Sequence, residues 1–156
     1  MHATPDTSEP RPSAVSIHVA DSPSDLPAWL DLDRLAEFLH NSLKPYEDPL
    51  PVVRRGLDDA FSTGGFLVLA TSDERVLGAL AMLRTGMEGY IPANLLLFVA
   101  VDPATRGQGL GRRIVEAALE HADGDVKLHV EYDNPAKRLY ERIGFSSKYA
   151  EMRYSA

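Results

Sequence analysis

The chain has 156 residues, of which 44% are hydrophobic and 25% charged, which is typical of one soluble globular domain with a core of its own. It contains no cysteine, so disulfides and thiolate catalysis are excluded, and a cytoplasmic location is expected. Its formal net charge of −7 argues against a nucleic-acid partner, and no apolar run reaches the roughly 18 residues of a membrane span.

The first half of the chain carries a leader and the beginning of one domain. Residues 1–13 are polar and rich in proline, which predicts a disordered leader. Residues 14–156 show no internal repeat, and we interpret them as a single domain. Apolar spacing predicts its first five elements: a strand at 15–19, an amphipathic helix over 25–43, a shorter helix over 52–61, and a hairpin of strands at 65–71 and 75–84.

The second half alternates strands and helices. Its five expected elements are an apolar strand at 94–101 buried on both faces, a helix from 110 to about 122, a strand at 126–132, a helix capped by Asn134 that closes at Gly144, and a last strand within 146–156. The order β-α-α-β-β-β-α-β-α-β predicts a mixed sheet with helices packed on it.

A loop with glycines at alternate positions over 107–111 precedes the helix that starts at 110. Glycines allow close approach of the backbone to a ligand, and a helix start adds free N–H groups and partial positive charge. Cations usually favour the other end of a helix, yet arginines accompany this loop at positions 106, 112 and 113. The combination indicates a site for a diphosphate with a further phosphate nearby.

Two familiar phosphate motifs do not fit this loop. A P-loop ends in Gly-Lys-Ser/Thr, whereas Gly111 is followed by two arginines. A dinucleotide fingerprint starts at the strand end and needs a third glycine at its sixth position, where this loop has Arg112. On the glycines alone, a flexible connector before a helix remains the alternative.

The stretch VDPATRGQGLG, residues 101–111, resembles the acetyl-CoA signature of the GNAT superfamily of N-acetyltransferases, whose core is Gln/Arg-x-x-Gly-x-Gly/Ala. Arg106, Gly109 and Gly111 take the defining positions. A second stretch, LHVEYDNPAKRLYERIGF, is similar to the family's strand, its N-x-x-A-x-x-x-Y-type helix and its Gly-Phe pair. The matching residues of this second stretch are Asn134, Ala136, Leu139, Tyr140, Gly144 and Phe145.

The resemblance implies the α/β acyl-CoA fold of this family, with a central mixed sheet of six to seven strands flanked by about four helices. It implies an acetyl-CoA-dependent N-acetyltransferase that moves an acetyl group to a primary amine of a small molecule or of a protein N-terminus or lysine. Acetyl-CoA is then a co-substrate, no metal is needed, and the partners are CoA and an amine acceptor, without nucleic acid or membrane. A homodimer is left open. The alternative is a non-catalytic acyl-CoA-binding or sensing module.

The resemblance also assigns site residues. The strand 98–101 is expected to offer backbone groups to the pantetheine arm in the manner of an added strand, with Asn134 bonding the same arm. Tyr140 is expected to protonate the leaving thiolate, its alternative being a core aromatic residue. The full set of expected cofactor-binding residues is Phe98, Val99, Ala100, Val101, Arg106, Gly107, Gln108, Gly109, Leu110, Gly111, Arg112, Asn134 and Ala136.

The general base and the acceptor stay open. Many relatives carry a glutamate in the strand before the glycine loop, but the strand at 94–101 has no ionisable residue. Glu131, His129, Glu88 or a water chain remain as bases. Residues 21–61 hold nine Asp and Glu against four Lys and Arg, a local net charge of −5 that favours a cationic amine. Acyl chain preference is not specified.

Overall fold

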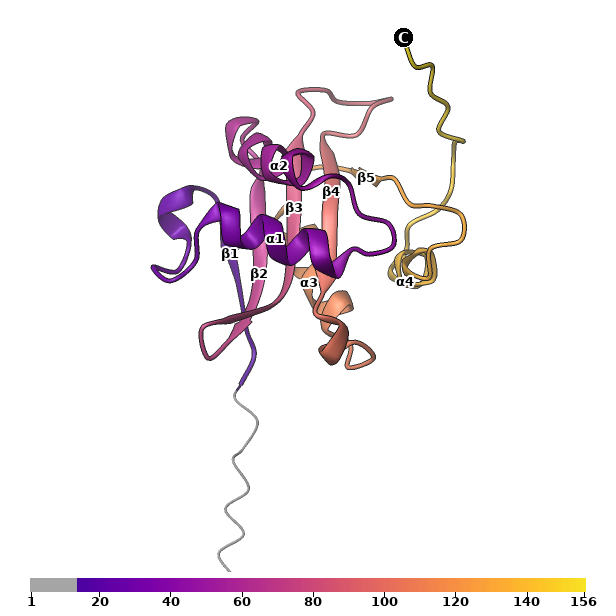
Figure 1. Cartoon of the computed structure of the whole chain (residues 1–156). Coiled ribbons are helices and arrows are strands. Elements are labelled where there is room, and N and C mark those ends of the chain that lie inside the picture. Colours follow the sequence, from indigo (N-terminus) through magenta and orange to yellow (C-terminus); the bar gives the residue numbers. More distant parts are fainter. Residues whose placement is uncertain (1–13) are drawn as a thin grey trace, which may run out of the picture.

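The computed structural model describes residues 14–156 and builds them into layers around a central sheet (Figure 1). The leader predicted for residues 1–13 lies outside the described residues. Helices α1 (Leu32–Ser42) and α2 (Leu50–Ser62) cover one face of the sheet, and α3 (Leu110–His121) covers the other.

The sheet of the described residues is mixed, as predicted, but it has fewer strands than predicted. Its five strands lie side by side in chain order: β1 (Ser16–Ala20), β2 (Phe66–Ser72), β3 (Arg75–Arg84), β4 (Asn94–Val101) and β5 (Val126–Leu128). The first four pair antiparallel, and β5 pairs parallel with β4. The prediction of six to seven strands is wrong, because the segment 146–156 pairs with none of them. Its large apolar side chains stay exposed, so no buried face holds it on the sheet.

The largest differences in element boundaries from the prediction are the start of α1 and the end of β5. α1 begins at Leu32 rather than at 25, because Asp31 caps it by accepting a 2.8 Å hydrogen bond from the Arg34 N–H. β5 ends at Leu128 rather than at 132, because only three of its residues pair with β4.

The hydrophobic core has one half on each face of the sheet. α1 and α2 pack on the first face through fully buried residues that include Leu35 and Leu57, and α3 packs on the second face through Ile114 and Val115. Each helix carries a single apolar stripe, and none in the described part of the chain is long and apolar enough to cross a membrane. Both α1 and α3 contact β4, from opposite faces of the sheet.

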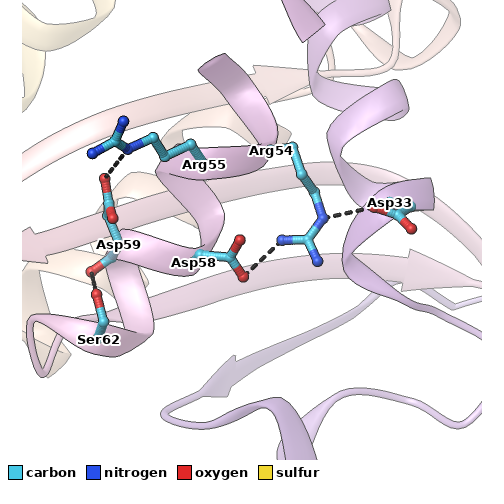
Figure 2. A network of polar contacts seen from close by, with 6 residues as sticks. All are labelled: Asp33, Arg54, Arg55, Asp58, Asp59 and Ser62. Atoms are coloured by element: carbon cyan, nitrogen blue, oxygen red, sulfur yellow. Dashed lines mark hydrogen bonds and ion pairs between the residues drawn. The ribbon is translucent and has the colours of Figure 1, made fainter. Parts of the chain in front are cut away.

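An arginine joins the two helices of the first face (Figure 2). Arg54 on α2 bonds Asp58 through Nη1 and Asp33 of α1 through Nε, each at 2.7 Å. The two carboxylates raise the pKa of Arg54, Asp58 more than Asp33. The pairs are partly exposed and contribute little to stability, and only the pair with Asp33 links α2 to α1, since Asp58 lies on α2 itself.

Candidate functional site

A cleft of about 1150 Å³ opens where β5 leaves β4. The two strands pair only over Asn94–Leu96, and the register between β3 and β4 shifts at Leu97, which has no partner. Beyond this bulge no strand of the described chain pairs with residues 97–101 on the β5 side. The backbone there is available to an extended ligand that lies as an added strand.

The glycine loop forms part of the cleft wall. Gly107 and Gly109 have φ angles of +81° and +78°, and a Cβ at either position would meet nothing within 4 Å. The backbone conformation requires glycine at both positions, and the open space lets a ligand approach their N–H groups. Gly109 is the N-cap of α3 and supplies no side-chain cap, so the first N–H groups of the helix are free to bind an anion.

Gly111 serves packing rather than a special backbone conformation. A Cβ there would lie 3.4 Å from Leu139 Cδ2 and 3.6 Å from Val101 Cγ2. The glycine therefore lets α3 lie close to β4 and to α4 (Ala136–Ile143). An added Cβ would make ordinary contacts there, whereas a larger side chain would press on the Leu139 and Val101 side chains.

The three arginines of the loop are not equivalent. The Arg106 guanidinium donates to the Ser42 carbonyl at 2.7 Å. Arg112 pairs with Glu116 on the next turn of α3, also at 2.7 Å, and both side chains are half exposed. Arg106 and Arg112 line the cleft, whereas Arg113 is exposed outside it.

Tyr140 on α4 is buried and also lines the cleft. It is 8% exposed, and its ring meets that of Phe145 edge-on with centroids 5.9 Å apart. Burial, and to a smaller degree the charge of Glu131, raises the pKa of Tyr140 to about 12. The phenol is neutral at physiological pH, as an ordinary tyrosine is, and it holds a proton at the cleft.

The raised pKa of Tyr140 predicts a specific loss of stability at alkaline pH. The native state holds this proton more tightly than an unfolded tyrosine with a pKa of 10.0, so the contribution is complete below pH 10 and disappears as the pH rises to about 12. Two pKa units correspond to roughly 2–3 kcal/mol. Urea unfolding between pH 8 and 12 should show this decline in the wild type and not in Tyr140→Phe. An equal decline in both proteins would contradict the assignment.

Glu131 follows β5 and lies near two tyrosine hydroxyls at the cleft. Its Oε2 accepts a 3.0 Å hydrogen bond from Asn134 Nδ2. The pKa of Tyr46 is raised by partial desolvation, to a smaller degree by Asp133, and least by Glu131. Glu131 also raises the pKa of Tyr140. One carboxylate is thus within electrostatic reach of both hydroxyls.

The other base candidates are arranged differently. His129 lines the same cleft as Glu131, whereas Glu88 lines a separate cavity of about 290 Å³ beside Arg84. Asn134 Oδ1 accepts from the Ala136 N–H at 2.9 Å just before α4, but the N-cap of the helix is Pro135 rather than the predicted Asn134. Within residues 14–156 no group of three or more His, Cys, Asp or Glu side chains could hold a metal ion.

Sequence reasoning missed the contribution of the C-terminal segment. Alternate side chains of this segment line the cleft, namely Ser147, Tyr149, Glu151 and Arg153. Arg153 pairs with Glu151, which raises the pKa of Arg153, and Asp48 from the α1–α2 connection raises it further. The sequence predicted this segment as a last strand of the sheet, but it pairs with no strand of the described chain.

Known proteins share the fold and the site-bearing part of this chain. The family described as "Acetyltransferase (GNAT) domain" matches residues 63–147. Mycothiol acetyltransferase from Actinosynnema mirum is 37% identical over 106 residues, which are 63% of this chain and 33% of that protein. Mycothiol acetyltransferase from Arthrobacter sp. strain FB24 is 28% identical over 149 residues, 92% of this chain and 46% of that protein. The chain spans about half or less of the length of such relatives.

Two solved structures show the same fold. Aminoglycoside N-acetyltransferase AAC(6′)-Iy in complex with CoA has a TM-score of 0.67 at 15% identity, covering 94% of this chain and 97% of that one. A GNAT family acetyltransferase from Streptococcus pneumoniae has a TM-score of 0.64 at 17% identity, covering 92% and 98%. At these identities the likeness concerns the fold alone.

Proposed function

This chain belongs to the family of GNAT acetyltransferase domains, and from that premise we propose that it is an acetyl-CoA-dependent N-acetyltransferase acting on a primary amine. The observation that carries the proposal is the cleft between β4 and β5. It combines an unpaired strand backbone, a glycine loop at a helix start and a buried neutral phenol. The fold shared with an acetyltransferase solved in complex with CoA supports it.

The cofactor-binding part of the proposal assigns each segment one portion of CoA. The N–H groups of residues 107–112 hold the pyrophosphate, and Arg112 faces the ribose phosphate. The backbone of 98–101 bonds the pantetheine arm as an added strand would. Asn134 orients Glu131 and lies where its amide can also reach that arm.

The proposed chemistry needs a base for the amine and an acid for the sulfur, while acetyl-CoA supplies the thioester. Glu131 accepts a proton from the ammonium, directly or through water, and the free amine then forms the new C–N bond. A backbone N–H near Val99 polarises the thioester carbonyl. The C–S bond then breaks, and the hydroxyl proton of Tyr140 passes to the sulfur of CoA. The second nitrogen proton returns to the Tyr140 oxygen through water. Glu131 releases the proton that it took from the ammonium to solvent, which restores the enzyme.

Glu131 is the base that the geometry favours. Its carboxylate raises the pKa of both Tyr46 and Tyr140, and it accepts a hydrogen bond from Asn134. Glu88, in contrast, lines the other cavity. The proposed acceptor is a cationic amine, drawn to the carboxylates and tyrosines of the α1–α2 connection and the C-terminal segment. Because curated relatives are named mycothiol acetyltransferases, a test panel of amines should include desacetyl-mycothiol.

Cofactor binding can be tested by thermal unfolding. CoA at about 100 times its Kd should stabilise the native state by roughly 2.7 kcal/mol, which raises Tm by about 5–10 °C. Desulfo-CoA should act nearly as well, because the phosphates and pantetheine make most contacts. Gly109→Val, which strains a left-handed backbone and fills the space in front of it, should lose most of the shift.

Two outcomes separate the proposed enzyme from its alternatives. If neither CoA nor desulfo-CoA shifts Tm at millimolar concentration, the cofactor assignment is wrong. If CoA shifts Tm but no amine of the panel releases free thiol from acetyl-CoA, the chain is a binding or sensing module instead.

A further inference from the structure

Helix α1 ends beside the glycine loop. The last carbonyls of a helix lack a partner N–H within the helix. Ser42, the last residue of α1 and only 6% exposed, has its carbonyl bonded by Arg106 from the glycine loop, 64 positions away in sequence. A guanidinium at this position also complements the partial negative charge of the helix end. Arg106 therefore caps α1 from the opposite side of the cleft entrance.

The segment that follows α1, residues 43–49, contacts both sides of the cleft, and we call it the crossing segment. Its Tyr46 hydroxyl donates to the Asp133 carbonyl at 3.2 Å, between β5 and α4. The Tyr46 N–H donates to the Leu43 carbonyl at 2.8 Å, which closes a turn directly after α1. The position of the crossing segment is thus set by Arg106 at its start and by the β5–α4 connection at its middle.

We propose that Arg106 is a positioning residue that couples the glycine loop, where CoA binds, to the crossing segment, where the acceptor binds. This inference rests on the proposed function. A ligand that immobilises residues 106–111 also immobilises Ser42 through the guanidinium, and with it Tyr46 and Asp48. CoA binding should therefore raise the affinity for an acceptor held by the crossing segment. By linkage, the acceptor raises the affinity for CoA by the same factor. The Arg106 side chain acts on the helix end rather than on a phosphate.

Amide hydrogen exchange of the crossing segment tests this coupling, with Leu43 and Tyr46 as the probes. Arg106→Gln removes the charged donor, and Arg113→Gln is the matched control, because it removes the same charge near the same helix start without a contact to α1. In Arg106→Gln we expect both amides to exchange roughly three- to tenfold faster than in the wild type. CoA should slow their exchange in the wild type and in Arg113→Gln, but not in Arg106→Gln. Arg106→Lys, which keeps a donor and a charge, should restore part of the protection.

The results also distinguish this coupling from the proposed function. Failure of the wild type to bind CoA overturns the proposed function and the coupling with it. CoA binding with equal protection in wild type and Arg106→Gln overturns the coupling alone. A loss of CoA affinity in Arg106→Gln more than tenfold beyond that in Arg113→Gln, with unchanged exchange at Leu43 and Tyr46, makes Arg106 a phosphate ligand and refutes the positioning role.

Discussion

Tyr140→Phe should lower turnover by roughly 10²–10⁴-fold, the usual contribution of a positioned general acid, while barely changing the free energy of unfolding at neutral pH or the affinity for CoA. The substitution removes one oxygen and keeps the ring, so the edge-on contact with Phe145 and the packing against α3 persist. Without the hydroxyl, the thiolate must leave unprotonated or take its proton from water. Thiol release with the best amine of the panel measures the rate, and urea unfolding measures stability on the same preparations.

Tyr140→Ala is the variant that separates catalysis from packing. Removal of the buried ring should cost roughly 3–5 kcal/mol of stability whatever the role of the hydroxyl. Only a catalytic hydroxyl makes the Phe variant slow and stable. A Phe variant with wild-type stability and wild-type turnover would remove Tyr140 from the mechanism and leave it as a core aromatic residue.

Local spacing was sufficient to predict most of the elements that carry the site. The run NLLLFVAV forms β4 with the predicted bounds, and the apolar stripe from Leu110 forms α3. The glycines at 107 and 109 proved to have positive φ angles, as a close backbone approach requires. These features depend on residues near one another in sequence, which is why the pattern reveals them.

The shape of the cleft depends on a feature that the sequence does not mark. β4 was predicted to be buried on both faces, but every second residue of β4 is only partly buried, and β5 leaves it after Leu96. A uniformly apolar run gives no sign of the bulge at Leu97, and therefore no sign of where β5 must end. The cleft forms where β5 separates from β4. This separation depends on how β4 pairs with both β3 and β5, which involves segments far apart in the sequence.

Contacts between distant segments were equally hidden. Arg106 was predicted to add charge for a phosphate, yet its guanidinium bonds the carbonyl of Ser42. Tyr46 reaches Asp133 across 87 positions. Such contacts leave no periodic pattern in the sequence, and the sequence does not show which charged side chains bond a distant part of the fold.

Glu131→Gln should lower kcat/KM by roughly 10²–10⁴-fold, because the amide cannot accept the proton of the ammonium. The amide is nearly isosteric and its oxygen can still accept from Asn134, so Glu131→Gln changes the proton acceptor with little change in packing.

Spectrophotometric titration of the tyrosines gives a readout independent of turnover. Because the negative charge of Glu131 contributes to the raised pKa of Tyr140, its neutralisation should lower that pKa, although burial, the larger cause, keeps it above 10. Glu88→Gln is the matched control, since Glu88 lines the other cavity and should leave rate, pH profile and titration unchanged. A Glu131→Gln variant that keeps wild-type turnover would transfer the role of base to His129 or to water.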